Sequence, residues 1–236
     1  MDLERKILID ILSAFDVSND RLPIIIKKHY KENDVSHAQR KRIKVTTNEI
    51  IRNRGIIDHI IEKTSSRKIR NIQPKLKSIL RLGCYDLLYD EIIPDYAAIH
   101  SSVELGKNLI SKKSGAMVNA VLRNMQRERV SNPTWLKKFK SNNIELSCPK
   151  WLVKKWRGQF GETNTKKLCE SYLKKSPMFL RVDTKQISIK KAIILLNQSA
   201  IEVESTISQK NPDVRLNLLK KGADLFISGA IKSDPK

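Results

Sequence analysis

The chain has 236 residues, of which 40% are hydrophobic and 30% are charged, and it contains only 8 Gly and 8 Pro. This composition excludes collagen-like, low-complexity and wholly disordered proteins, and the length predicts one or two globular domains. The 46 Lys and Arg residues outnumber the 25 Asp and Glu residues and give a net charge of +21. Such an excess favours an anionic partner such as nucleic acid, although a Lys-rich excess also arises from codon usage.

The first 130 residues predict a series of amphipathic α-helices, because apolar residues recur at three- and four-residue steps. The expected helical segments are 7–15, 22–30, 36–55, 56–63, 74–89, 95–111 and 115–129. In the third segment, Ser36 is expected to cap the first turn and Gly55 to end the helix. This half of the chain is therefore predicted to be all-α, with six or seven helices.

The character of the sequence changes after the turn-forming residues 131–133. Helices are expected at 134–140, 149–160, 163–174 and 188–199, and strands at 178–182, 201–204 and 214–218, where apolar and polar residues alternate. The order strand, helix, strand, strand is typical of a small α/β domain. We therefore predict a mainly α chain with a helical domain at 1–130, a helical linker at 131–175 and a small α/β domain at 176–236.

Two clusters of cations are candidate contacts to RNA phosphates. The first consists of Arg40, Lys41, Arg42, Lys44, Arg52 and Arg54. The second consists of Lys112, Lys113, Arg123 and Arg127. Positions 40, 41 and 44 share one face of a helix, which favours a row of phosphate contacts; the alternative for both clusters is a solvated helix face.

Five aromatic residues in the second half allow two interpretations. Exposed rings beside Lys154, Lys155 and Arg157 would stack on unpaired bases, whereas helical spacing of three of the rings favours a buried stripe. The buried stripe is the preferred interpretation. The five residues are Trp135, Trp151, Trp156, Phe160 and Tyr172.

The sequence predicts no catalytic residue, no cofactor-binding residue and no metal site. The four histidines show no H-x-x-x-H spacing, and the three cysteines include no C-x-x-C pair. Neither a P-loop nor a G-x-G-x-x-G motif is present. Without a signal peptide or an apolar run of 18 residues, the expected location is cytoplasmic and away from membranes.

Several segments, read in order, resemble the NusB-like helical domain. They are 79–89 (ILRLGCYDLLY), 97–99 (AAI), 103–107 (VELGK) and 118–123 (VNAVLR). This domain occurs alone in the transcription antitermination factor and also at the N-terminus of bacterial RsmB/Sun-type 16S rRNA cytosine-C5 methyltransferases. Segments 149–156 (PKWLVKKW) and 178–184 (MFLRVDT) are similar to the linker and small domain that follow it in the methyltransferases.

The resemblance implies an RNA-binding region that positions small-subunit ribosomal RNA for methylation. The catalytic domain of that family is Rossmann-like, uses S-adenosylmethionine and is expected beyond Lys236, so the cofactor is expected in the full-length family and not in this chain. The family's nucleophile lies in a Pro-Cys pair; Cys148-Pro149 has the reversed order, so no catalytic residue carries over. Whether the chain acts as an enzyme stays open.

Two alternatives remain from the sequence. The first is a NusB-like antitermination factor without enzymatic activity, whose partner would be a small ribosomal protein. The Arg-rich N-terminal stretch of that factor is represented here only by Arg5 and Lys6. The second alternative is a protein-interaction scaffold whose charge reflects codon usage.

Overall fold

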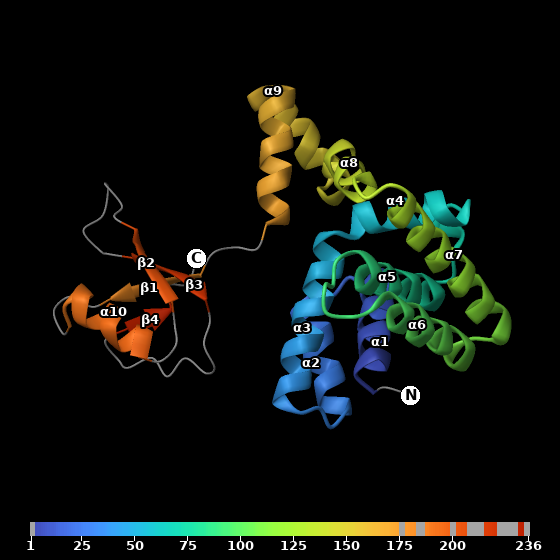
Figure 1. Cartoon of the computed structure of the whole chain (residues 1–236), viewed down its shortest axis with the longest axis horizontal. Helices are drawn as coiled ribbons and strands as arrows, with labels where there is room; N and C mark the ends of the chain where they lie inside the picture. Colours follow the sequence, from blue (N-terminus) through green and yellow to red (C-terminus); the bar gives the residue numbers. More distant parts are fainter. Residues whose placement is uncertain are drawn as a thin grey trace. The chain divides into compact units, whose positions relative to one another are not determined.

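The computed structural model describes residues 3–174, 178–182, 187–198, 202–206, 215–220 and 231–233 (Figure 1). The chain divides into two compact units, Met1–Leu173 and Lys174–Lys236. The first unit is helical, and the second contains a four-stranded sheet with one helix. The predicted fold class, a mainly α chain with a small α/β part, is confirmed.

The described part of the first unit consists of nine α-helices and two short 3₁₀ segments. Seven of the α-helices begin before residue 131, as the periodicity predicts. The elements are α1 (Leu3–Val17), α2 (Leu22–Glu32), α3 (His37–Arg52), α4 (Arg54–Ser65), η1 (Ile69–Asn71), α5 (Pro74–Leu88), α6 (Asp95–Leu109), α7 (Lys112–Ser131), α8 (Trp135–Asn142), η2 (Ile144–Ser147) and α9 (Lys150–Leu173).

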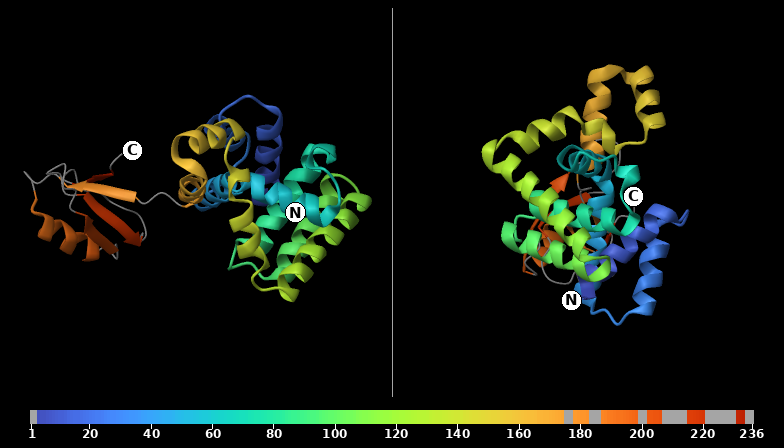
Figure 2. Two further views of the ribbon diagram at one scale, coloured as in Figure 1. Left: turned by 90° about the horizontal axis from the view of Figure 1, so that it is seen from above. Right: turned by 90° about the vertical axis from the view of Figure 1, so that its right-hand side faces the viewer.

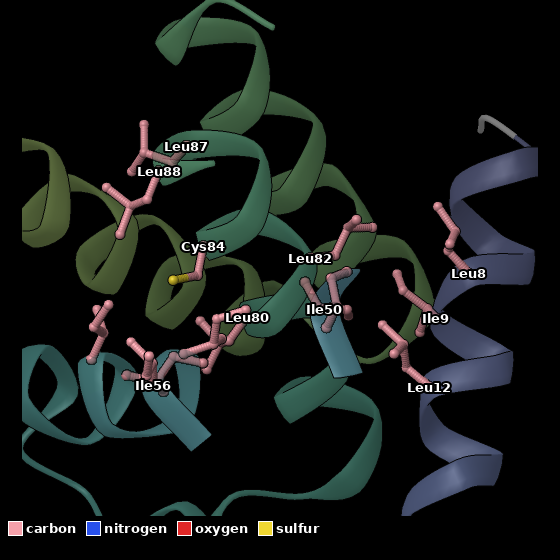
Figure 3. Packing of buried hydrophobic residues seen from close by; sticks show 14 of the residues in the cluster. Leu8, Ile9, Leu12, Ile50, Ile56, Leu80, Leu82, Cys84, Leu87 and Leu88 are labelled. Atoms are coloured by element: carbon pink, nitrogen blue, oxygen red, sulfur yellow. The ribbon is translucent and has the colours of Figure 1, made fainter. Parts of the chain in front are cut away.

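Helix α5 is the centre of the helical unit, where it packs against α1, α3, α4, α6 and α7. Helices α6 and α7 run side by side along it (Figure 2). In the core, Ile9 and Leu12 of α1 point toward Leu82 of α5 and Ile50 of α3 (Figure 3). Each such side chain contributes about 1.5–3 kcal/mol when it leaves water, so this apolar contact stabilises the arrangement that carries the surface helices.

The junction between α3 and α4 differs from the prediction in one respect. Ser36 caps α3 as expected, in a capping box with Gln39. However, α3 already ends at Arg52, and Gly55 lies in the first turn of α4, so its predicted role as a helix stop is wrong. A Cβ on Gly55 would lie 1.8 Å from the carbonyl oxygen of Leu146, so the glycine permits close approach of η2 to α4.

The last part of the helical unit is built in succession: α8 packs on α7, η2 packs on α4, and α9 packs on η2. Helix α9 is interrupted at Gly161, whose φ of 75° is left-handed and non-helical. This break confirms the two separate helices predicted at 149–160 and 163–174. The division into domains at 1–130, 131–175 and 176–236 stays a prediction.

The second unit has a fully antiparallel sheet among its described strands. Strand β1 is central and pairs with both β3 and β4, while β2 pairs with β3, which gives the order β2-β3-β1-β4. The last strand was not predicted, because three residues are too few to show an alternating pattern. The elements are β1 (Met178–Val182), α10 (Ile189–Gln198), β2 (Glu202–Thr206), β3 (Arg215–Lys220) and β4 (Ile231–Ser233).

A buried ion pair joins the first helix to the central one. Arg5 of α1 lies beside Asp86 of α5, with 2.6 Å between Nη2 and Oδ2, and the same nitrogen donates to Ser102 Oγ at 3.3 Å. Desolvation of the Asp86 carboxyl outweighs the attraction of Arg5 and raises its pKa to about 6. The protonated form of Asp86 is therefore favoured by the fold.

This carboxyl predicts a specific pH dependence of stability. Because the folded pKa of Asp86 exceeds its unfolded value, its stabilising contribution is complete below about pH 4 and is lost as the pH rises through about 6. In urea titrations, the free energy of unfolding is expected to fall less steeply between about pH 4 and about pH 6 in Asp86→Asn than in the unmodified chain. Replacing the exposed Asp20 with Asn is the control; an unchanged slope in Asp86→Asn would contradict the assignment.

Candidate nucleic-acid interface

Helices α2 and α3 lie side by side (Figure 1). Both helices carry exposed lysines. Lys41 and Lys44, one turn apart on α3, form no ion pair with any described residue. The neighbouring α2 adds exposed Lys27, Lys28 and Lys31, which the sequence analysis missed because they lie outside its densest cationic tract. The five lysines, termed here the α2–α3 lysine face, place positive charge where backbone phosphates would bind.

A groove of about 290 Å³ lies between the two helices, and two of these lysines, Lys27 and Lys44, line it. The aliphatic and aromatic residues of α2 form one wall, and α3 forms the other. The Tyr30 hydroxyl donates to the Arg40 carbonyl oxygen at 2.7 Å and ties the helices together. The groove is lined by Leu22, Pro23, Ile26, Lys27, Tyr30, Lys44 and Asn48.

Two arginines of the first predicted cluster make contacts within the protein. Arg40 donates from Nε to the carbonyl oxygen of Val35 at 2.9 Å, and its guanidinium lies 5.6 Å from the centroid of Tyr30. Arg42 forms an ion pair with Glu4 of α1 at 2.7 Å, although its side chain is 68% exposed. Both guanidinium groups keep N–H donors that face solvent. However, these contacts within the protein already neutralise part of their positive charge or fix the direction in which it points.

The remaining members of this cluster lie where α3 ends, at Arg52, and where α4 begins, at Arg54. Arg52 pairs with Glu49 on the same helix, and Arg54 lies 3.7 Å from Asp16 and 5.6 Å from the ring centroid of Phe15. Since a helix rises 1.5 Å per residue, Arg40 and Arg52 are about 18 Å apart along α3. The structure therefore brings together Lys41 and Lys44 but separates them from Arg52 and Arg54.

The second predicted cluster is also divided along one helix. Lys112 and Lys113 lie exposed in the first turn of α7, where the helix dipole disfavours cations. Arg123 donates to Gln126 at 3.0 Å and lies about three turns further along, and Arg127 donates to Asn124 at 2.5 Å and lies about four turns further along. The two lysines and the two arginines would therefore contact different parts of a ligand.

The preferred prediction of a buried aromatic stripe is wrong for three of the five rings. Trp135 is 7% exposed, but Trp151, Phe160 and Tyr172 are 68%, 50% and 62% exposed. Trp156 is intermediate and packs on Tyr172, with ring centroids 5.5 Å apart. Helical spacing alone does not determine which side of a helix is covered by another element: α9 packs on η2, and this contact leaves Trp151 and Phe160 exposed.

The cysteines have no reactive environment. All three are buried, and desolvation raises the pKa of Cys84, of Cys148 and, to about 12, of Cys169.

Within the described residues, no group of three or more His, Cys, Asp or Glu side chains could hold a metal ion. Over the same residues, no helix combines the length and apolar character needed to cross a bilayer.

The described residues do not fit S-adenosylmethionine. Rossmann-like cofactor sites lie where parallel strands lead into helices through glycine-rich turns. The described strands pair only antiparallel, and β1, the strand that precedes α10, lies between two antiparallel neighbours. Among the described strands, no parallel pair is therefore available to hold this cofactor.

Comparison with known families decides the relationship. The NusB family model matches residues 3–127, which is more than half of the chain. The chain belongs to the NusB family. A second region, residues 148–213, matches the ferredoxin-like domain of RsmF/B-like methyltransferases. This NusB-family chain thus contains both regions that the sequence resemblance predicted, in the predicted order.

Individual relatives agree with this assignment. The chain is 29% identical over 201 residues to the probable ribosomal RNA small subunit methyltransferase B of Bacillus subtilis (strain 168), covering 85% of this chain and 45% of that protein. It spans about half the length of the curated relatives it matches.

Two solved structures share the fold. A protein chain in the crystal structure of a plectonemic RNA supercoil covers 55% of this NusB-family chain, with a TM-score of 0.52 and 21% identity. The crystal structure of PH0851 covers 94%, with a TM-score of 0.52 and 15% identity. At these identities the likeness concerns the fold alone.

Proposed function

We propose that this chain is the RNA-binding region of an S-adenosylmethionine-dependent 16S rRNA cytosine-C5 methyltransferase. The observation that carries the proposal is the succession of a NusB region and an RsmF/B-like ferredoxin-like region in one chain. Relatives that match both regions are named as ribosomal RNA small subunit methyltransferases, which supports ribosomal RNA as the ligand. The role of this chain is to hold the RNA so that a catalytic domain reaches its cytosine.

The charge distribution supports this role. Lysines contact phosphates as flexible point charges, and each neutralised phosphate releases counterions and adds salt-dependent affinity. The α2–α3 lysine face consists of five exposed lysines, none of which forms an ion pair with a described residue. Such contacts fix the position of the RNA without reading its sequence, as a positioning region requires.

The α2–α3 lysine face gives a direct prediction. Changing Lys41 and Lys44 together to Ala is expected to weaken binding to a small-subunit rRNA fragment and to lower the slope of log affinity against log salt by about 2. The reason is the loss of two phosphate contacts, and the measurement is fluorescence anisotropy at several salt concentrations. Neither lysine forms an ion pair with a described residue, so the fold is expected to be unaffected.

The matched control changes Lys137 and Lys167, which are also exposed, to Ala. This variant removes the same net charge from α8 and α9 and is expected to keep the slope within about one unit of the unmodified chain. Equal slopes for the two double variants would mean that binding follows net charge alone, and the assignment of the α2–α3 lysine face would fail.

NusB-family membership also favours a second candidate, a transcription antitermination factor. That function predicts tight association with a small ribosomal protein and preference for leader RNA. The ferredoxin-like match at residues 148–213 supports the methyltransferase interpretation instead. Pull-down of purified small ribosomal proteins separates the candidates: a stoichiometric complex would favour antitermination, and its absence together with rRNA binding would favour the methyltransferase region.

A further inference from the structure

A second hollow in the helical unit lies between α4 and α8, away from the α2–α3 groove. Its volume is about 390 Å³, within the range of small-ligand sites. Helix α4 contributes His59 and Lys63, and the rest of the lining comes from the α7–α8 junction, from α8 and from Asn143 directly after it. We refer to this site as the α4–α8 pocket.

Aromatic rings form one side of the α4–α8 pocket. Trp135 and Phe139 of α8 are buried and lie 5.7 Å apart between centroids. The His59 ring lies 5.4 Å from Phe139, and its side chain is 44% exposed. An exposed flat ring supported from behind by a buried ring is a surface on which a nucleobase stacks.

Polar groups with unused hydrogen-bonding capacity face the same site. The side-chain oxygen of Asn132 accepts from the backbone N–H of Thr134 at 3.2 Å and its hydroxyl at 2.9 Å, so its amide N–H groups have no partner among the described residues. The amide of Asn143 donates to the Phe139 carbonyl at 2.9 Å, which leaves its side-chain oxygen to accept. Buried Trp135 Nε1 also lacks a partner among the described residues. These hydrogen-bond donors and this acceptor together match the edge of a nucleobase, which also carries both donors and acceptors.

Two cations complete the α4–α8 pocket. Lys63 Nζ lies 5.7 Å from the Phe139 centroid, and both Lys63 and Lys138 are exposed. Neither forms an ion pair with a described residue, and no carboxylate lines the pocket. Their ammonium groups are therefore free to bind a phosphate attached to the stacked nucleoside.

We propose that the α4–α8 pocket binds one unpaired nucleotide of the RNA held by this chain. Its base stacks on His59, its edge bonds to Asn132 and Asn143, and its phosphate lies between Lys63 and Lys138. This inference rests on the proposed RNA-binding function. It adds a preference for RNA that offers an unstacked base, because base-paired nucleotides cannot enter a pocket.

The test compares two RNA hairpins that differ only by one bulged nucleotide. The full chain is expected to bind the bulged hairpin about fivefold more tightly or better, as one stacked base contributes. Changing Lys63 and Lys138 to Ala, or His59 to Ala, is expected to abolish this ratio. Changing Lys112 and Lys113 to Ala is the control and leaves the ratio intact, whatever its effect on overall affinity.

A second measurement follows the Trp135 indole N–H by NMR, assigned from its loss in Trp135→Phe. Nucleoside 5′-monophosphates are expected to shift this signal and leave those of Trp151 and Trp156 unmoved. An equal response to inorganic phosphate would reduce the site to an anion site and overturn the proposal. If the chain binds both hairpins with equal affinity, and the variants do the same, the proposal for the α4–α8 pocket is overturned but the proposed RNA-binding function is not. If the chain binds neither hairpin, the proposed function is overturned as well.

Discussion

Replacing Arg81 with Met is expected to lower the free energy of unfolding of the helical unit by about 3–5 kcal/mol. Arg81 is only 4% exposed, in the central helix α5. Its Nε and Nη2 donate to the two carboxylate oxygens of Asp58 at 2.6 and 2.8 Å, and its Nη1 donates to Asp16 at 2.8 Å. One guanidinium thus joins α1, α4 and α5.

The cost of the substitution comes from the carboxylates that it leaves behind. The Asp16 side chain is 7% exposed, and among the described residues it keeps only Lys77, at 2.8 Å, and the more distant Arg54 as cationic neighbours. Despite desolvation, the bonds from Lys77 and Arg81 hold the pKa of Asp16 below its usual value, so Asp16 is charged at neutral pH. Removing one member of a buried ionic network leaves uncompensated charge, which is costlier than removing the whole network.

Urea denaturation followed by circular dichroism at pH 7 measures the effect. The exposed Arg127, changed to Met in the same way, is the control and is expected to change stability by less than about 0.5 kcal/mol. Adding Asp16→Asn and Asp58→Asn to the Arg81→Met chain is expected to recover part of the loss. A loss below about 1 kcal/mol, or no recovery, would show that the network is not the source of stability.

The same network illustrates what sequence reasoning could reach. The helices of the first unit follow from the periodicity of apolar residues, because each helix buries one stripe against the core. The partners of Arg81 do not follow from it, since Asp58 and Asp16 lie 23 and 65 positions away and are brought to it only by packing. The segment 79–89 carries the family resemblance without revealing this role.

The candidate interface could also be predicted from the sequence only in part. Cationic clusters are visible in a sequence, but the residues that neutralise them are not: Arg42 meets Glu4 across two helices, whereas Lys41 beside it has no ion pair with a described residue. The α4–α8 pocket was missed for the same reason, because His59 and Lys63 on α4 are far along the chain from Asn132 and α8. Only the aromatic pair Trp135 and Phe139, at helical spacing, offered a local signal.

A substitution at Gly55 is expected to have the second large effect on the stability of the helical unit. Changing it to Ala is expected to destabilise the helical unit by about 3 kcal/mol, at the upper end for overpacking. The added Cβ would lie 1.8 Å from the Leu146 carbonyl oxygen and 2.3 Å from its carbon, and backbone atoms cannot move aside as a flexible side chain can. Segment η2 must therefore withdraw from α4, which also loosens the packing of α9 on η2.

Gly158→Ala is the matched control because the same atom is added within a helix, and no described atom beyond the adjacent residues and the helix's own backbone lies within 4 Å of it. It is expected to stabilise the chain by up to about 1 kcal/mol, since alanine restricts the unfolded backbone and favours helix. Urea titration gives the two opposite signs, and hydrogen exchange at residues 144–148 is expected to quicken only in Gly55→Ala. Two changes of the same sign would mean that helix propensity, rather than the approach of η2 to α4, governs both positions.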